Sequence, residues 1–184
     1  MPIETERLIL RMWQTSDRAE FARINSDSRV MEFMPACLSP AETDRFLDRI
    51  RQHFLNHGFG LYAVELREDR RFIGALGLMV PAFQAHFTPC VEIGWRLAAD
   101  CWGCGLATEG ARAIVNHAFE SLRLDSLVSF TVPANIRSRR VMEKIGMTRD
   151  SADDFEHPNL PEGHPLRSHV LYRLGRADWA RSRR

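Results

Sequence analysis

The chain has very little net charge. Its 184 residues include 25 Lys and Arg against 24 Asp and Glu, which leaves a net charge of +1 at pH 7. A surface so balanced creates no long-range field that would gather a nucleic acid or an anionic membrane. The sequence also has no basic N-terminal segment leading into an apolar run, and glycine and proline interrupt its longest uncharged stretch. We therefore expect no nucleic-acid partner, no membrane partner and a cytoplasmic location.

Cysteine is also scarce. The chain has Cys37, Cys90, Cys101 and Cys104, which are too few for a disulfide scaffold, so we expect reduced thiols. Hydrophobic residues make up 45% of the chain and charged residues 27%, proportions that suit a globular protein with its own core. We expect a single domain over residues 1–184, with 177–184 as a polar C-terminal tail.

Hydrophobic periodicity predicts strands and helices that alternate along the chain. Ser39, Pro40 and Glu42 form a helix start signal, and Gly146 is a helix stop signal. The predicted strands are 6–13, 60–66, 71–80, 90–98, 127–132 and 169–174, the predicted helices are 17–25, 39–57, 106–122 and 138–146, and 152–168 is a polar loop. This order predicts the α/β (α+β) class, with one mixed sheet flanked by helices.

The stretch 101–107, "CWGCGLA", allows two kinds of chemistry. Its C-x-x-C spacing is found in zinc sites and in redox dithiols, although the other cysteines supply no second ligand pair. Its small residues Gly103, Gly105 and Ala107 precede a helix, where free backbone N–H groups and the helix dipole bind anions such as a pyrophosphate. The cysteines can also be small apolar fillers in that turn. The stretch alone does not decide between these interpretations.

A carboxylate stands in the predicted strand 90–98. Strand alternation places Glu92, Gly94 and Arg96 on one face. A carboxylate among apolar neighbours can have a raised pKa and serve as a general base, although a structural ion pair with Arg96 or another basic group explains Glu92 equally well. The alternative bases are His86, His157, His164 and His169. The His-Pro pairs of the 152–168 loop are candidates for lining an acceptor pocket.

A second motif, "NIRSRRVMEKIGM", follows the strand 127–132. Together with "TERLILRMW" and "EIGWRL…CWGCGLATEG", in that order, it resembles the GNAT superfamily of acyl-CoA N-acetyltransferases. The similarity is greatest to its ribosomal-protein N-terminal acetyltransferase-like (RimJ/RimL-like) branch and covers roughly residues 4 to 175. The resemblance implies a single-domain fold with a mostly antiparallel central sheet. It also implies acetyl-CoA as co-substrate, with no metal.

The same resemblance implies site residues. The loop 102–107 would hold the pyrophosphate, the backbone of 96–98 would pair with the pantetheine arm, and Asn135 and Ser138 would lie beside the reacting thioester. From the residues themselves, we expect Glu92 as the base and Ser138 as a proton relay, so these two are the predicted catalytic residues. The implied acetyl-CoA-binding residues are Arg96, Leu97, Ala98, Trp102, Gly103, Cys104, Gly105, Leu106, Ala107, Thr108, Asn135 and Ser138. The chain departs from the family pattern twice, with Trp102 where many members have Arg or Gln and Met142 where many have a tyrosine acid. Asn135 and Ser138 can also act as helix caps.

The expected function is acetyl transfer to a primary amine, either a protein N-terminal α-amine or a small-molecule amine. An α-amine is the easier acceptor, because its deprotonation at pH 7 costs about 1 kcal/mol against nearly ~5 kcal/mol for lysine. The missing tyrosine leaves a non-catalytic acyl-CoA-binding module as the alternative. The sequence shows no oligomer interface, so a homodimer also stays open.

Overall fold

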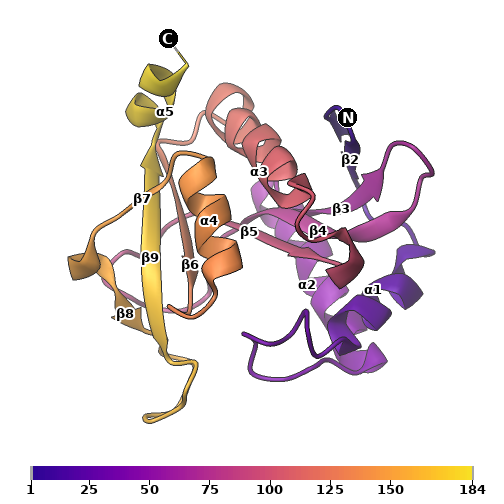
Figure 1. The fold of residues 1–184 in the computed structure, drawn as a ribbon, viewed down its shortest axis with the longest axis horizontal. Coiled ribbons are helices and arrows are strands. Elements are labelled where there is room, and N and C mark those ends of the chain that lie inside the picture. The colour runs from indigo at the N-terminus through magenta and orange to yellow at the C-terminus, as the bar shows by residue number, and fades with distance from the viewer. Residues whose placement is uncertain (1, 184) are drawn as a thin grey trace.

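The computed structural model describes residues 2–183 as a sheet covered by helices on both faces (Figure 1). All neighbouring strands are antiparallel except β5 and β6, so the sheet is mixed and mostly antiparallel, as expected. The strands in spatial order are β1 (Ile3–Glu4), β2 (Leu8–Arg11), β3 (Leu61–Leu66), β4 (Phe72–Met79), β5 (Glu92–Leu97), β6 (Ser126–Thr131), β9 (Ser168–Gly175) and β7 (Thr148–Arg149), while β8 (Phe155–Glu156) pairs with β9.

The helices lie on opposite faces of the sheet. The helices are α1 (Asp17–Ser26), α2 (Pro40–His57), α3 (Leu106–Asn116), α4 (Ile136–Lys144) and α5 (Arg176–Ser182). Gly110 of α3 lies against Leu76 of β4, whose partner in β5 is Trp95. The next residue, Arg96, points to the other face and donates to Asn25 of α1. In the part of the chain described, no helix is long and apolar enough to span a membrane.

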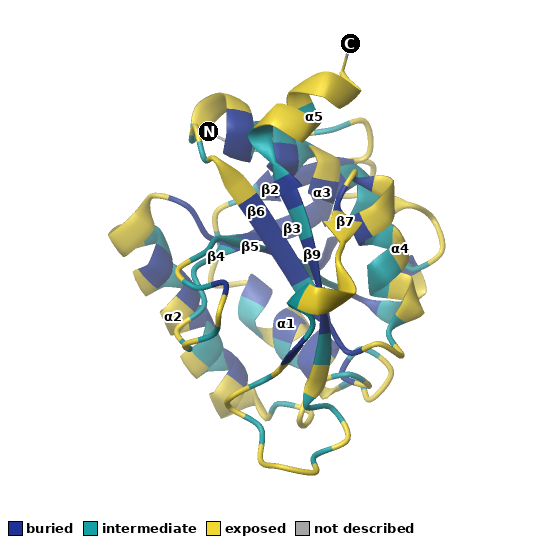
Figure 2. Ribbon diagram, turned by 90° about the vertical axis from the view of Figure 1, so that its left-hand side faces the viewer, coloured by how far each residue is buried: buried dark blue, intermediate teal, exposed yellow. Residues whose placement is uncertain are grey.

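The predicted helix start at Ser39 is confirmed. The Ser39 side chain accepts from the Glu42 N–H, and the Glu42 carboxylate accepts from the Ser39 N–H at 2.8 Å. Buried residues follow the strands and the inward turns of the helices (Figure 2). On β2, Leu8, Ile9 and Leu10 are all buried, so neither face of this strand is exposed along these three residues. The alternation predicted for 6–13 is therefore wrong at Ile9.

Other boundaries also differ from the sequence prediction. The helix α4 begins at Ile136 rather than 138, because the Asn135 side chain caps it. The polar loop 152–168 contains the strand β8, and a short helical turn, Ser151–Asp153, precedes it. The segment expected as a polar tail is helical to Ser182. Trp179 fixes it, with its Nε1 donating to Asn116 Oδ1 at 3.1 Å and its ring 5.3 Å from that of Phe119.

The parallel strands β5 and β6 touch at one end only. Glu92 and Val128 are their single register pair, supported by a bond from Val128 N–H to the Val91 carbonyl and by one from Ser129 Oγ to the Ile93 carbonyl, both 2.9 Å long. Beyond this point the strands separate. The edge of β5 that would face β6 is thus left without a partner strand toward its C-terminal end.

Candidate active site

A cavity of about 400 Å³ opens beside the separated strands. It lies between the C-terminal half of β5, the start of α3, the helix α4 and the segment 29–34. The predicted residues that line it are Arg96, Leu97, Trp102, Gly103, Gly105, Leu106, Ala107, Thr108, Asn135 and Ser138. Three predicted residues do not line the cavity. Ala98 is buried, Cys104 is exposed, and Glu92 lies further back along β5.

The start of α3 presents a row of free backbone N–H groups. Gly105 has φ +81° and is the N-cap of α3, and the first helical bond runs from Glu109 N–H to the Gly105 carbonyl at 3.0 Å. Within residues 2–183, no backbone acceptor receives the N–H groups of 103–108. Gly103 also has a positive φ, +76°, which turns the chain toward the helix. Such an arrangement binds phosphate groups.

A carboxylate outside the cavity holds this loop in place. Glu109 accepts hydrogen bonds from Thr5 Oγ1 at 2.6 Å, from Arg7 N–H at 2.8 Å and from Arg7 Nε at 2.7 Å. The same arginine donates from Nη1 to the Cys104 carbonyl at 3.0 Å. Burial alone would raise the pKa of the Glu109 carboxyl, but the bonds from Thr5 and Arg7 outweigh burial and lower it. The N-terminal strands are thereby tied to the loop.

We expect Glu109→Gln to lower the free energy of unfolding by about 2 kcal/mol at pH 7, because the three donors of Thr5 and Arg7 lose a charged acceptor. A carboxyl with a lowered pKa in the folded protein stabilises it above the ordinary value of 4.5, and this stability is lost as the pH falls through the folded pKa. The difference from wild type should therefore shrink at pH 4 in urea titrations. The control is Glu20→Gln on the exposed side of α1, with an expected change below about 0.5 kcal/mol. Equal effects of the two substitutions would contradict this role.

Trp102 is bonded within the protein. Its Nε1 donates to the Leu97 carbonyl at 3.0 Å, and the guanidinium of Arg137 lies 4.5 Å from the centre of its ring. Arg137 in turn pairs with Glu32 at 2.7 Å. The tryptophan thus joins the end of β5 to α4, which leaves anion binding in this loop to the backbone.

The backbone groups that face the cavity are those of Trp95 and Leu97. Ala98 N–H donates to the Ile73 carbonyl of β4, so the strand alternation directs the N–H and carbonyl groups of Arg96 toward β4 as well. The N–H and carbonyl groups of Trp95 and the N–H of Leu97 point away from β4, toward the cavity. The predicted segment 96–98 is therefore displaced by one residue, because the pairing register of β4 and β5 decides which groups are free.

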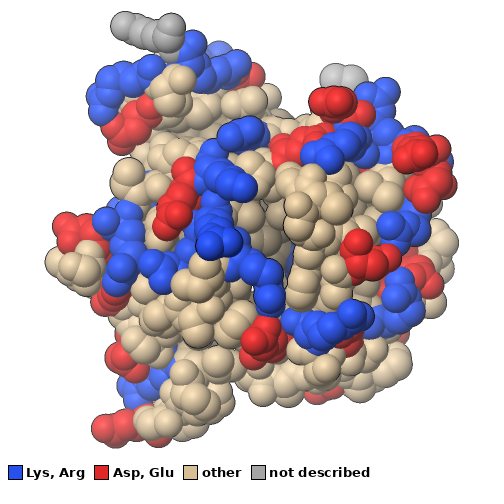
Figure 3. Space-filling model, viewed as in Figure 1, with Lys and Arg blue, Asp and Glu red and all other residues tan. Residues whose placement is uncertain are grey.

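Basic side chains surround the cavity. Its lining includes Arg29, Arg96, Arg137, Arg140 and Lys144, and no Asp or Glu of the described residues lines it. Figure 3 shows Lys and Arg gathered beside the hollow on this face. Arg140 and Lys144 form no ion pair within residues 2–183. The cavity therefore favours an anionic ligand.

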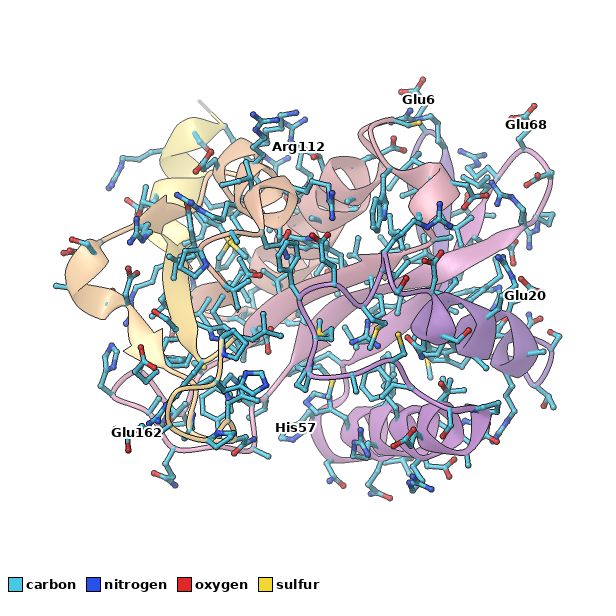
Figure 4. All side chains as sticks on the ribbon, turned by 60° about the horizontal axis from the view of Figure 1, so that its bottom comes forward. Glu6, Glu20, His57, Glu68, Arg112 and Glu162 are labelled. Atoms are coloured by element: carbon cyan, nitrogen blue, oxygen red, sulfur yellow. The ribbon has the colours of Figure 1, made fainter. Side chains whose placement is uncertain are left out.

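The helix α4 is fixed against α3 at this side of the cavity. Arg112 of α3, which Figure 4 labels, donates from Nη2 to the Lys144 carbonyl at 3.0 Å. At the start of α4, Asn135 Oδ1 accepts from Ser138 N–H at 3.2 Å, and Asn135 Nδ2 donates to Thr131 Oγ1 at 3.0 Å. The capping role of Asn135 is thus present, while the Ser138 hydroxyl has no partner in the described structure.

Glu92 does not line the cavity but precedes, on β5, the residues Trp95 to Leu97 that do. Burial raises the pKa of its carboxyl to about 8. A Cβ placed on Gly94 would meet Glu92 Oε1 at 3.8 Å, so the carboxyl points along β5 toward Gly94. No ion pair joins Glu92 to Arg96, whose Nη1 donates to Asn25 Oδ1 instead. The structural alternative of an internal ion pair is therefore wrong.

The four histidines considered as bases lie away from the cavity. The rings of His157 and His169 are 5.1 Å apart among the side chains of Phe130 and Phe155, and burial lowers the pKa of both. His86 Nε2 is 3.6 Å from Asp153, and His164 accepts from a backbone N–H of its own loop. The tip of that loop, marked by Glu162 in Figure 4, lies on the far side of the molecule from Glu6 and Glu68.

Met142 is 1% exposed and belongs to the core, so the position of the family tyrosine faces inward here. The cysteines of "CWGC" are free thiols, Cys101 buried and Cys104 exposed. Burial raises the pKa of Cys101, which makes it less reactive. Within the described residues, no three His, Cys, Asp or Glu side chains come together as a metal site.

The site thus combines two separated parallel strands with a helix start whose free N–H groups can bind an anion. Residues 7–148 match the family model described as an acetyltransferase (GNAT) domain. The chain belongs to the GNAT family of acetyltransferases. The chain is 29% identical to the uncharacterized N-acetyltransferase YnaD of Bacillus subtilis, over 97% of this chain and 99% of that protein.

Solved structures agree with this assignment. A GNAT-family acetyltransferase from Bacillus anthracis superposes with a TM-score of 0.78 at 25% identity, over 96% of this chain and 99% of that one. A ribosomal-protein-S5-alanine acetyltransferase from Vibrio fischeri has a TM-score of 0.74 at 17% identity, over 97% and 98%, which shows a common fold. The protein is thus an acetyltransferase, and the redox and zinc interpretations of "CWGC" are not supported.

Proposed function

We propose that the protein transfers the acetyl group of acetyl-CoA to a primary amine by direct attack of the amine on the thioester. The observation that carries this proposal is the row of unpaired N–H groups at 103–108, which opens into the same cavity as two unpaired cations and the free edge of β5. A pyrophosphate, further phosphate charge and an amide-bearing arm are what such a set of groups would bind.

The residues present fit acetyl-CoA part by part. The N–H groups of 103–108 would hold the pyrophosphate, and Arg140 and Lys144 would neutralise phosphate charge. The free backbone groups of Trp95 and Leu97 would pair with the amides of the pantetheine arm, as a neighbouring strand would. Asn135 and Ser138 line the cavity beside this path.

Proton transfer is assigned to Glu92 and Ser138. When bound, acetyl-CoA supplies an activated carbonyl carbon that a neutral amine can attack. Glu92 would take the proton of the attacking amine through a water, because its carboxyl points along β5 toward Gly94 but does not itself line the cavity. The Ser138 hydroxyl, which has no partner in the part of the chain described, would relay a proton from water to the leaving sulfur, taking one up as it gives its own. A thiol of pKa near ~8.5 needs little help to leave, so the buried Met142 does not prevent catalysis.

The acceptor class follows from the amine's own pKa. A weak base such as Glu92 suits an amine that is partly neutral at pH 7, which favours a protein N-terminal α-amine or another low-pKa amine over a lysine side chain. The order of the three motifs supports placing the protein in the RimJ/RimL-like branch. The experiment is a mass-spectrometric search for an acetylated product among peptides and small amines. Tight acetyl-CoA binding without product from any amine would favour the acyl-CoA-binding module instead.

Neutralising the two unpaired cations should weaken acetyl-CoA binding. We expect Arg140→Gln with Lys144→Gln to raise the Kd about 10-fold or more, because each removes a charged partner of a phosphate group. The effect should diminish at high salt. The matched control is Arg45→Gln with Arg123→Gln, two exposed arginines outside the cavity. If both double variants bind acetyl-CoA as the wild type does in calorimetric titrations, the phosphate site is misplaced.

A further inference from the structure

One cation of the cavity has only uncharged partners. The Arg96 guanidinium donates from Nη1 to Asn25 Oδ1 at 2.8 Å, its Nη2 is 3.7 Å from Met34 Sδ, and its Cζ is 5.4 Å from the centre of the Phe46 ring. Burial lowers the pKa of Arg96 to about 10, as expected of a desolvated cation without a counterion. Arg96 is also one of the residues that line the cavity.

The guanidinium is held in place by a buried polar pair. Asn25 and Thr43 are both fully buried, and Asn25 Nδ2 donates to Thr43 Oγ1 at 3.2 Å. This bond leaves Asn25 Oδ1 as the acceptor for Arg96. A guanidinium carries several N–H donors, and Asn25 receives only a bond from Nη1. The chain therefore presents a preoriented donor set to a ligand.

No carboxylate of the described residues neutralises this cation. Glu32 pairs with Arg137, and Asp27 pairs with Arg29. Glu92 lies on the same strand face four residues away, about 13 Å along an extended strand, and its raised pKa keeps it mostly uncharged at pH 7. An anion is thus the missing partner of Arg96.

The position of Arg96 separates it from the phosphate-binding groups. The loop 103–108 and α4 approach the cavity from the α3 side of the sheet, whereas the Arg96 side chain lies on the α1 side. Phe33 and Met34, from the segment between α1 and α2, line the cavity on that side with it. An anion bound on this side of the sheet would therefore belong to the second substrate rather than to the phosphates of acetyl-CoA.

We propose that Arg96 binds a carboxylate of the acceptor, so that the acceptor is a primary amine with a carboxylate a few bonds away. This inference rests on the proposed function. The chemistry is shared by a free amino acid and by a peptide whose first residue is Asp or Glu. A guanidinium recognises a carboxylate through two parallel hydrogen bonds, which fixes the orientation of the amine as well as its affinity. Polycationic amines are disfavoured at this position by the same charge.

The test compares matched acceptors. One arm uses free amino acids against their amides, and the other uses peptides that begin with Asp or Glu against the same peptides with Asn or Gln. The expected result is a kcat/KM about 10- to 100-fold higher for the carboxylate-bearing member in at least one arm. The arm that shows the preference identifies the source of the carboxylate.

The variants assign that preference to Arg96. In Arg96→Gln the ratio of kcat/KM values for the two acceptors should fall to near unity, mainly through a change in KM. Arg96→Lys should retain part of the preference, because the lysine ammonium keeps the positive charge without the paired hydrogen bonds. The control is Arg49→Gln, because Arg49 lies over the same Phe46 ring at 5.4 Å but is exposed on α2 and outside the cavity. It should keep the full preference.

Contrary outcomes are distinct. Turnover without any carboxylate preference, or a preference that survives Arg96→Gln, overturns this inference and leaves the acetyltransferase proposal standing. A large loss of acetyl-CoA affinity in Arg96→Gln would assign the side chain to the co-substrate and also overturn it. Absence of product from every amine would overturn it together with the proposed function.

Discussion

Glu92→Gln is expected to lower kcat about 100-fold while leaving acetyl-CoA affinity within a few-fold of wild type. General base catalysis by a positioned carboxylate contributes roughly this factor, and an amide cannot accept the proton. Because burial raises the pKa of Glu92 to about 8, the base is mostly protonated at pH 7, and the wild-type rate should rise as the pH passes through that value. The variant should lose this rise. The control is Glu68→Gln on the β3–β4 turn, remote from the cavity.

The acceptor amine contributes an inflection of its own. The pH dependence of the rate should therefore be measured with two acceptors whose amines differ in pKa. The inflection that falls at the same pH with both acceptors belongs to Glu92. Stability provides an independent control. A carboxyl whose folded pKa is raised makes the protein less stable as the pH rises from its unfolded value of 4.5 toward 8. Glu92→Gln should then be at least as stable as wild type at pH 8, and a kcat equal to that of wild type would exclude Glu92 as the base.

Gly74→Ala should lower the free energy of unfolding by more than about 3 kcal/mol. Gly74 lies in β4 at φ +139°, paired with Leu97, and a Cβ there would be 2.1 Å from the Arg96 carbonyl oxygen and 2.9 Å from Leu97 Cα. Both contacts are with backbone, which cannot rotate away. Either β4 separates from β5 or the side chain is strained, and a steric conflict of this kind belongs to the most destabilising class of substitution.

The matched control for Gly74→Ala is Gly163→Ala. Gly163 also has a positive φ, +77°, but nothing lies within 4 Å of its would-be Cβ. It should cost about 1 kcal/mol, the usual penalty for a non-glycine residue in such a conformation. Denaturant titrations of both variants measure the contrast. Similar losses would mean that β4 and β5 are not as close at Gly74 as described, and the assignment of Trp95 and Leu97 as cavity-facing backbone, which depends on that register, would fail.

Local patterns in the sequence predicted the elements that local physics determines. The helix start at Ser39 depends on residues three positions apart, and the loop before α3 depends on Gly103 and Gly105, so both could be identified along the chain. The N-terminal cap of α4 could also be identified from the sequence. Asn135 was considered as a cap, and the helix begins directly after it.

Features that depend on distant residues could not be predicted in this way. Glu109 meets Thr5 and Arg7 across more than 100 positions, so no local pattern connects them. The choice of Trp95 and Leu97 as the cavity-facing backbone depends on the register of β4 against β5. The segment 29–34, which lines the cavity, carries no motif. The helix α5 was not predicted, because a single tryptophan, Trp179, supplies most of its apolar contact.

The most direct test of the central claim is amide hydrogen exchange with and without acetyl-CoA. If the unpaired N–H groups of 103–108 hold the pyrophosphate, their exchange should slow in proportion to occupancy, because each then donates a hydrogen bond. The segment around Trp95 and Leu97 should also be protected, while the 157–166 loop should not change. Acetyl-CoA binding that leaves 103–108 unprotected would contradict the account, since the cavity beside β5 would not be the binding site.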